Sequence, residues 1–308
     1  MTLGPEPDEP PAHGSTKTAS LELQPRDVYS QCGEDGILHD LFLRLGIQSG
    51  YCVEFGAWDG IQMSNTYNLI VNHGWRGLVI EADQHLFELL RSNMAPHPDV
   101  TCLRAAVGFD GAEQLDSILR GASAPEEFEL LSIDIDGNDY HVWDVMRSYR
   151  PKVVVVEFNP TIPNHVAFVQ PRDTRIKQGS SVLALARLGA RKGYRPVAAT
   201  LVNVVFVRAD LADDAGIPVL PLDLIRTNHA WETNILQLLD GTIKVVGPTR
   251  GIWNGIEMRF VGVQSVPRFL RVYPPDAARW QRPWLRLLER ESRFRARART
   301  RLKMRNRR

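Results

Sequence analysis

Residues 53–60 read Val53-Glu54-Phe55-Gly56-Ala57-Trp58-Asp59-Gly60 and end a short apolar run that begins at Tyr51. The run predicts a buried strand and the residues from Ser64 onward predict a helix, so the stretch forms the turn between them. Glycine lets the backbone approach a ligand closely, and Glu54 can accept hydrogen bonds from a cationic or hydroxyl-bearing one. The stretch therefore predicts a nucleotide-type binding loop, with a plain strand–turn–helix connection as the alternative.

A second carboxylate, Glu81, ends the next apolar run, 21 residues after Gly60. At this place in a nucleotide-binding sheet a carboxylate binds the two hydroxyls of a ribose. Trp58 stands where a dinucleotide fingerprint needs its second glycine, and Glu54 would repel a diphosphate. The amino group and the sulfonium of S-adenosylmethionine are cationic instead. The loop and Glu81 together favour S-adenosylmethionine as the cofactor.

Short apolar runs alternate with helix-length segments between Tyr51 and Arg208, which indicates an α/β sheet. The predicted strands are Tyr51–Phe55, Leu78–Glu81, Thr101–Val107, Leu130–Asp134 and Val153–Phe158. The predicted helices are Ser64–His73, His85–Met94, Tyr140–Tyr149 and Ser180–Lys192. The strands are apolar throughout, as expected for parallel strands that are covered on both faces.

Two further strands are predicted at Arg195–Thr200 and Asn203–Val207. Only Leu201 and Val202 separate them, and so short a link cannot hold a crossover helix. They therefore form an antiparallel hairpin. A mostly parallel sheet closed by such a hairpin is typical of methyltransferase Rossmann-like folds rather than of dehydrogenases.

Composition describes an ordinary globular chain of 308 residues with 44% hydrophobic residues and a net charge of +1. The three cysteines, Cys32, Cys52 and Cys102, have no paired or metal-type spacing, which suggests a reducing compartment. We expect Cys52 and Cys102 to be buried in strands. No apolar run reaches the roughly 18 residues of a membrane span, and no signal-peptide core is visible. These features predict a cytoplasmic protein without a transmembrane segment.

Charge is distributed unevenly along the chain. Residues 279–308 hold 13 Lys/Arg against two Glu, a net of +11, so the remainder carries a net of −10. The basic segment could touch an anionic membrane surface, a nucleic acid or an acidic polysaccharide, or could act as a solvated arm beside its own acidic domain. We expect a disordered Pro-rich start (1–23), a catalytic-type α/β domain (24–210), a cap or accessory segment (211–278) and the basic tail (279–308).

A second polar cluster ends the fourth predicted strand, where Asp134 and Asp136 precede Gly137-Asn138. The next strand ends in Glu157-Phe158-Asn159. Ligands of open α/β sheets bind at the carboxyl ends of strands, so these groups should face the same crevice as Gly56 and Glu81. One carboxylate could act as a general base, and several could hold a divalent cation. Asp134 could instead cap the following turn.

The succession of four motifs resembles the FkbM-type S-adenosylmethionine-dependent methyltransferases. The motifs are Ser30–Gly36, the loop Glu54–Gly60, Glu81 and Ser132–Tyr140, and the resemblance runs from about Tyr29 to Val207. It implies a Rossmann-like class I methyltransferase fold with a seven-stranded sheet. It also implies methyl transfer to hydroxyl groups of natural products or sugars.

The resemblance assigns roles to individual residues. Glu54, Gly56, Asp59 and Gly60 would surround the methionine part of the cofactor, and Glu81 would bind its ribose. Asp134 and Asp136 would lie beside the sulfonium and the acceptor. The commonest family loop, acidic-Gly-Ala-Asn, is altered here at Trp58-Asp59, and the usual Asp-Val-Glu-Gly is Asp134-Ile135-Asp136-Gly137. Each departure keeps a carboxylate, although the altered acceptor side leaves the acceptor open.

The predicted mechanism is in-line transfer of the methyl group to an acceptor oxygen, which requires alignment and removal of a proton. Asp136 is the first choice for the base and His141 the second, with a surface position as the alternative for His141. A bound Mg²⁺ could lower the pKa of the acceptor hydroxyl, as in catechol-type enzymes. The segment Gln31–Asp35 is either a lid over the site or a helix N-terminus whose acidic residues favour the helix dipole.

Two other functions compete with methyl transfer. Asp134-Ile135-Asp136 imitates the Asp-x-Asp that holds the metal of a nucleotide-sugar in glycosyltransferases, but this function leaves Glu54–Gly60 and Glu81 without a role. A non-catalytic interaction protein that retains the fold is the other. Specific nucleic-acid methylation is not expected, since the body is acidic and Asn159-Pro160-Thr161 lacks the aromatic of a base-flipping motif. The acceptor, metal dependence and oligomeric state are not fixed by the sequence.

Overall fold

The computed structural model describes residues 23–252, 255–258, 263–264 and 266–305. The chain divides into two compact units, Met1–His229 and Ala230–Arg308. Most of the Pro-rich start predicted at 1–23 therefore lies outside the described residues. No helix in the described part of the chain is long and apolar enough to cross a membrane.

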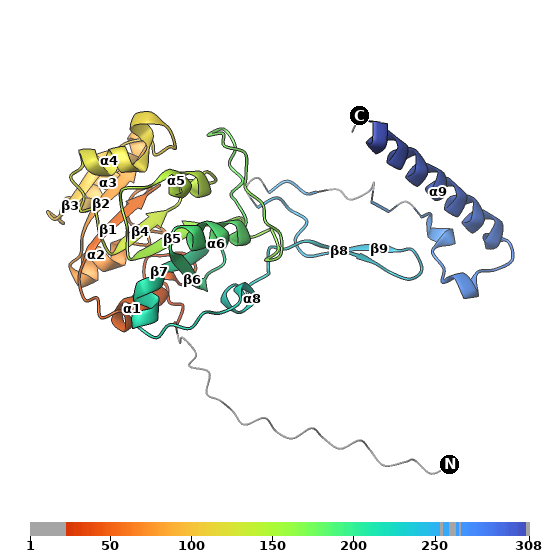
Figure 1. The fold of residues 1–308 in the computed structure, drawn as a ribbon, viewed down its shortest axis with the longest axis horizontal. Helices are drawn as coiled ribbons and strands as arrows, with labels where there is room; N and C mark the ends of the chain where they lie inside the picture. The colour runs from red at the N-terminus through yellow and green to blue at the C-terminus, as the bar shows by residue number, and fades with distance from the viewer. Residues whose placement is uncertain (1–22, 253–254, 259–262, 265, 306–308) are drawn as a thin grey trace, which may run out of the picture. The chain divides into compact units, whose positions relative to one another are not determined.

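The first unit is built on a seven-stranded sheet with the order β3-β2-β1-β4-β5-β7-β6 (Figure 1). Its strands are β1 (Tyr51–Phe55), β2 (Arg76–Glu81), β3 (Val100–Arg104), β4 (Leu130–Ile133), β5 (Val153–Glu157), β6 (Tyr194–Ala199) and β7 (Asn203–Arg208). The first five strands are parallel, and β7 pairs antiparallel with both β5 and β6. This is the Rossmann-like class I methyltransferase fold, so the predicted fold class and its closing hairpin are confirmed.

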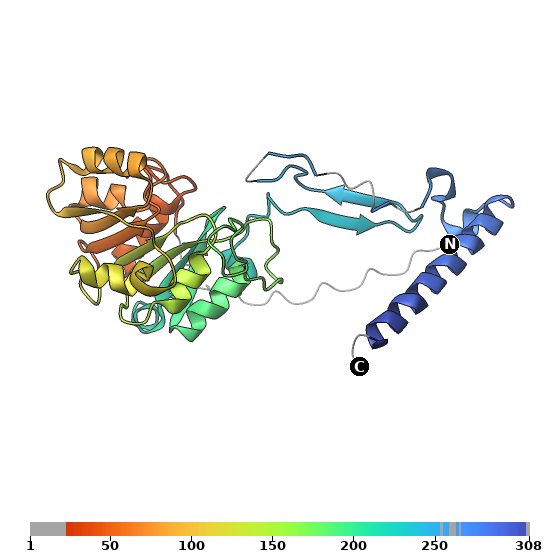
Figure 2. The same ribbon diagram turned by 90° about the horizontal axis from the view of Figure 1, so that it is seen from above.

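Helices cover both faces of the sheet, as the apolar strands require. One face packs against α4 (Leu115–Gly121), α5 (Asp139–Val145) and α6 (Val182–Arg191). The other packs against α1 (Glu34–Arg44), α2 (Tyr67–His73), α3 (Gln84–Met94) and the short α7 (Ala209–Asp214). Side chains alternate between the two cores: Val53 and Phe55 of β1 face the first and Cys52 faces the second. Figure 2 shows the layers from above.

Most predicted elements occur within a few residues of their expected bounds, and the differences have local causes. β3 ends at Arg104 rather than at Val107, and as an edge strand it is only half-buried, including Cys102. α5 ends at Val145 rather than at Tyr149, because the backbone turns extended at Met146 and the next two N–H groups bond to the Asp116 carboxylate. All three cysteines are free.

The segment before α1 is fixed to the body by two buried carboxylates. Glu34 accepts hydrogen bonds from the backbone N–H of Cys32, from the Thr200 hydroxyl and from the Asn203 amide. Asp35 accepts from the backbone N–H groups of residues 28–30. Both begin α1, so the expectation of an acidic helix N-terminus is confirmed for these two residues.

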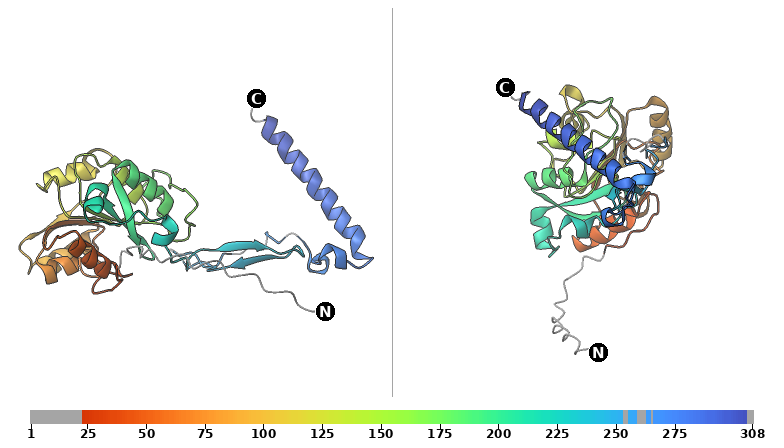
Figure 3. Two further views of the ribbon diagram at one scale, coloured as in Figure 1. Left: turned by 60° about the horizontal axis from the view of Figure 1, so that its bottom comes forward. Right: turned by 90° about the vertical axis from the view of Figure 1, so that its right-hand side faces the viewer.

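The second unit contains an antiparallel pair, β8 (Asn234–Gln237) and β9 (Ile243–Val246), and a long helix, α9 (Gln281–Arg305). Two short 3₁₀ turns, Arg268–Leu270 and Pro274–Asp276, precede α9. Figure 3 shows α9 as one continuous helix in both of its views. The first unit also includes α8 (Leu222–Ile225), which contacts β6.

Candidate active site

A cavity of about 660 Å³ lies at the carboxyl ends of β1, β2, β4 and β5. This is the edge at which open α/β sheets bind their ligands. The carboxyl ends of these strands supply Glu54 and Gly56, Glu81, Asp134, and Glu157. Gln31 and Val202 complete the wall from the segment before α1 and from the β6–β7 link.

The wall of the cavity is strongly acidic. Its six carboxylates are Glu54, Glu81, Asp83, Asp134, Asp136 and Glu157, against a single cationic side chain, Lys177. Lys177 lies at the rim, 67% exposed, with its Nζ 3.5 Å from Asp136 Oδ2. A cavity of this charge attracts cations and repels phosphates.

Glu54 lines the cavity, and its two oxygens are engaged by the loop before α2. It accepts hydrogen bonds from the Ser64 hydroxyl (2.6 Å), the Asn65 backbone N–H (2.8 Å) and the Thr66 hydroxyl (2.7 Å). Burial raises the pKa of Glu54, and these three donors act in the opposite direction. In this structure Glu54 therefore holds the wall in place.

Gly56 lies where the β1 and β4 loops touch. Its φ is +73°, and a Cβ there would lie 1.6 Å from the backbone oxygen of Asp134. Only glycine can adopt this conformation without strain and approach the backbone of Asp134 so closely. The predicted glycine thus brings the β1 loop against Asp134 and shapes the cavity between them.

Glu81 ends β2 and lines the cavity at 8% exposure. Its oxygens accept hydrogen bonds from the backbone N–H groups of Trp58 (2.9 Å) and Asp83 (2.8 Å). Small or apolar side chains surround this end of the cavity: Ala82, Leu86, Ala105 and Val107. The carboxylate and this apolar wall suit a ligand that joins a hydroxyl-bearing ring to a flat apolar one.

Asp59 and Gly60 are not among the described residues that line the cavity. Asp59 accepts hydrogen bonds from the backbone N–H groups of Ile61 (2.9 Å) and Gln62 (2.8 Å), so its carboxylate closes the turn. Gly60 packs against Leu90 and Met94 of α3. The structure therefore gives both residues a role in the turn, apart from the cavity.

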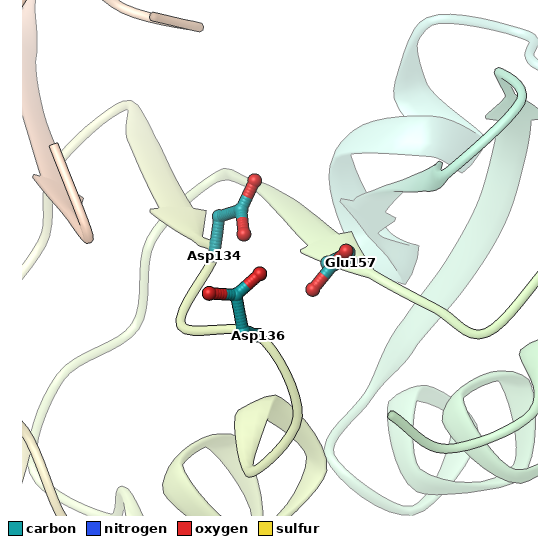
Figure 4. Close-up of side chains that lie close together, drawn as sticks. All are labelled: Asp134, Asp136 and Glu157. Carbon is teal, nitrogen blue, oxygen red and sulfur yellow. The ribbon is translucent and has the colours of Figure 1, made fainter. Parts of the chain in front are cut away.

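Asp134, Asp136 and Glu157 form one cluster from two neighbouring strands (Figure 4). One carboxylate oxygen of each lies within 4.8 Å of the others, a spacing that could hold a divalent cation. Burial, and then repulsion from the neighbouring carboxylates, raises the pKa values of Asp134 and Glu157 well above their usual range. Protonation of one of these carboxyls would lower the negative charge of the cluster without a metal.

His141 lies on α5 but does not line the cavity wall as described here. Its Nε2 lies 2.8 Å from the backbone oxygen of Gln170, and its ring contacts Phe109 and Tyr140 edge-on. The structure therefore does not bring the second predicted base to the other site residues. Glu157, which the sequence predicts at the same strand edge, lies in the cluster with Asp134 and Asp136.

Strained backbone gathers at the cavity. Four non-glycine residues in the described part of the chain have positive φ, and three of them line it: Trp58 (+52°), Met63 (+60°) and Asp136 (+56°). Trp58 and Met63 are large apolar residues, 41% and 50% exposed. Such conformations cost free energy and concentrate at functional sites. Trp58 belongs to the predicted binding loop, whereas nothing in the spacing of the sequence points to Met63 or Lys177 as wall residues.

No protein-family model matches the chain, and neither does any of the curated proteins searched. Among solved structures it is similar to the N-terminal domain of EvdMO1 in the presence of S-adenosylhomocysteine and D-fucose, with 12% identity, coverage of 57% of this chain and 82% of that chain, and a TM-score of 0.37. It is also similar to M. capricolum TrmK in complex with S-adenosylhomocysteine (8% identity, 55% of this chain and 67% of that chain covered, TM-score 0.35). A third is a Geobacter sulfurreducens S-adenosylmethionine-dependent methyltransferase in complex with S-adenosylhomocysteine (14% identity, 52% of this chain and 64% of that chain covered, TM-score 0.34). Likenesses at such identities and scores do not indicate the activity of this chain.

Proposed function

We propose that this chain is an S-adenosylmethionine-dependent methyltransferase of FkbM type that methylates a hydroxyl group of a sugar, glycan or other natural product. One observation carries the proposal: on a class I methyltransferase sheet, the cavity at the strand ends has six carboxylates and one lysine in its wall. Such a wall suits a ligand with a positive charge at its reactive centre. When bound, S-adenosylmethionine supplies an activated methyl group on a cationic sulfur.

The residues of the wall match the parts of this cofactor. Glu81 offers carboxylate oxygens for ribose hydroxyls, beside the apolar slot formed by Ala82, Leu86, Ala105 and Val107 for an adenine ring. Gly56 and Asp134 line the cavity together, and the amino acid moiety and the sulfonium would lie beside the carboxylates of this wall. Glu54 supports this region through the loop that it binds.

The acceptor side needs a group that removes a proton. Asp136 is our choice, because it lines the cavity, 58% of its side chain is exposed, and it lies beside Asp134. Lys177 lies close enough to orient its carboxylate. The carboxyl groups of Asp134 and Glu157 lie next to Asp136 and have raised pKa values, so protonation of one of them would reduce the negative charge around the base.

The same cluster supports a second candidate, a metal-dependent glycosyltransferase. Asp134, Asp136 and Glu157 could hold a divalent cation that bridges to a diphosphate, and a bound Mg²⁺ could equally assist methyl transfer by polarising the acceptor hydroxyl. Without a metal, the six carboxylates disfavour a diphosphate, so we rank glycosyl transfer second.

Calorimetric titration separates these functions. The purified full-length chain is titrated with S-adenosylhomocysteine, and separately with a uridine-diphosphate sugar plus Mn²⁺. We expect micromolar binding of S-adenosylhomocysteine that weakens at least tenfold in Glu81→Gln. The matched control is Glu88→Gln, which changes an exposed carboxylate on α3 outside the wall. Thermal unfolding of each variant checks that the fold persists.

Each outcome has a distinct meaning. Binding of the nucleotide-sugar alone would transfer the assignment to glycosyl transfer. Binding of neither ligand would favour the third function, a methyltransferase fold kept as an interaction module. Equal losses in Glu81→Gln and Glu88→Gln would remove Glu81 from the cofactor site while leaving the cofactor itself in place.

A further inference from the structure

Over residues 281–294, helix α9 separates its arginines from its apolar side chains. Arg282, Arg286, Arg290 and Arg293 recur at intervals of four, four and three residues, which places them on one face of an α-helix. The other side carries Trp284, Leu287, Leu288 and Phe294, with Glu291 as the one charged position among them. Such a division is typical of an amphipathic helix that lies at an interface.

Within its own unit, the apolar face of α9 is uncovered. Trp284, Leu287 and Phe294 are 53%, 54% and 75% exposed, although these are residues that normally gain free energy by burial. The start of the helix is attached to its own unit: the Gln281 side chain donates to the backbone oxygen of Phe269, and Trp280 stacks on the Phe269 ring. An anchored start therefore presents an open apolar face.

The helix is also strongly basic. Its 25 residues contain ten Lys/Arg and two Glu, a net charge of +8. Positive charge alone would fit any polyanion, including a nucleic acid or the acidic remainder of this chain. A nucleic-acid duplex offers no apolar layer to an exposed Trp–Leu–Phe face, whereas a bilayer offers an acyl layer directly beneath its anionic headgroups.

We propose that α9 binds the surface of a bilayer that contains anionic phospholipids. The helix lies in the plane of the interface, with Trp284, Leu287 and Phe294 in the acyl boundary and the arginine face against headgroup phosphates. This proposal does not depend on the proposed methyl transfer. The charge of the basic tail permits several anionic surfaces, and the apolar face of α9 favours a bilayer among them.

Vesicle flotation of the full-length chain tests the proposal. The vesicles are phosphatidylcholine alone, or phosphatidylcholine with 30% phosphatidylglycerol. We expect at least tenfold more bound protein on the anionic vesicles. The triple variant Trp284→Ser, Leu287→Ser, Phe294→Ser keeps every arginine and should lose at least tenfold. A matched control removes equally exposed apolar side chains from the first unit, as Val28→Ser, Leu43→Ser, Val219→Ser, and should float like the wild type.

A charge series completes the test. Arg286→Glu, Arg290→Glu should abolish flotation, whereas Arg286→Lys, Arg290→Lys should preserve most of it. If the apolar triple variant floats like the wild type, or if the protein binds single- or double-stranded oligonucleotides but not anionic vesicles, the proposal is overturned in favour of a polyanion-binding tail. Loss of flotation in the control triple variant would equally overturn it, since binding would not be specific to α9.

Discussion

The backbone oxygen of Asp134 occupies the position where a side chain on Gly56 would begin, since a Cβ there would lie 1.6 Å away. This contact joins the β1 loop to the β4 loop at the centre of the candidate site. Through it, the glycine of one predicted motif and the carboxylate of another become parts of one wall. Because of this contact, we expect a substitution at Gly56 to destabilise the fold.

Gly56→Ala should lower the free energy of unfolding by well over 2 kcal/mol, because the new methyl group meets backbone that cannot move without opening the cavity. Gly46→Ala is the matched control. Gly46 has a φ of +69°, close to the +73° of Gly56, but no atom lies within 4 Å of its Cβ position. It should cost only the strain of positive φ, about 1–2 kcal/mol. Urea unfolding measures both, and equal losses would show that the contact with Asp134 contributes nothing.

Asp136→Asn should reduce turnover by about 10²- to 10⁴-fold once an acceptor has been found by screening hydroxylated compounds, because an amide cannot take up the proton. Affinity for S-adenosylhomocysteine should change by less than threefold. Glu157→Gln should cost about tenfold or less, since the amide resembles the protonated form that the raised pKa of Glu157 favours. The exposed Asp99→Asn serves as control. A larger loss in Glu157→Gln than in Asp136→Asn would move the base to Glu157.

Sequence patterns predict the sheet well because strand location follows from local apolar runs. β1 has the predicted bounds, and β4 and β5 each differ by one residue at the end. Since parallel strands share one edge, the carboxylates that follow them converge, and the placement of Asp134, Asp136 and Glu81 in one cavity followed from topology.

The direction of side chains in the loops is not a local property, so a single sequence does not determine it. Asp59 lies three residues after Gly56, but a turn closed by the Gly60 N–H and the Ala57 oxygen (2.7 Å) carries it away from the cavity. His141 follows Asp136 closely, yet it contacts Gln170, 29 residues later in the chain. Lys177 reaches the cavity from the same long connection after β5. No periodicity in a single sequence records such contacts.

S-adenosylmethionine should bind more tightly than S-adenosylhomocysteine, by about tenfold, because the two ligands differ by a methyl group and one positive charge. A charge a few ångströms from several carboxylates gains about 1 kcal/mol or more even at the higher effective dielectric of a partly open cavity. Asp136→Asn should reduce this preference, while Asp99→Asn should leave it unchanged. Competition calorimetry measures the ratio. Equal affinities in the wild type would contradict the role assigned to the acidic wall.

The unfolding free energy should fall as the pH rises from about 4 to above 6, and Asp139 carries part of this dependence. Its carboxylate is 1% exposed and accepts hydrogen bonds from the backbone N–H groups of Ile135 (2.9 Å) and Gly137 (2.8 Å). Burial outweighs these donors and raises the pKa of Asp139 to about 6. A raised pKa means that the native state keeps a proton that the unfolded chain has already lost. The stabilisation is therefore complete below the unfolded pKa of about 4 and is lost as the pH passes 6, at a cost of about 3 kcal/mol.

The variant Asp139→Asn isolates this contribution, since it cannot ionise. Its unfolding free energy at pH 4 should be lower than that of the wild type, because one amide N–H then faces a backbone donor. Between pH 4 and pH 6.5 its unfolding free energy should fall less than that of the wild type, and the difference should be most of that 3 kcal/mol. Asp116→Asn is the control: its half-buried carboxylate also accepts two backbone hydrogen bonds, from Arg147 and Ser148 (2.8 and 3.0 Å). It measures what replacing a hydrogen-bonded carboxylate by an amide costs in unfolding free energy at each pH. Urea unfolding at three pH values decides the matter, and parallel profiles for the wild type and Asp139→Asn would show that Asp139 is ionised in the native state throughout this range.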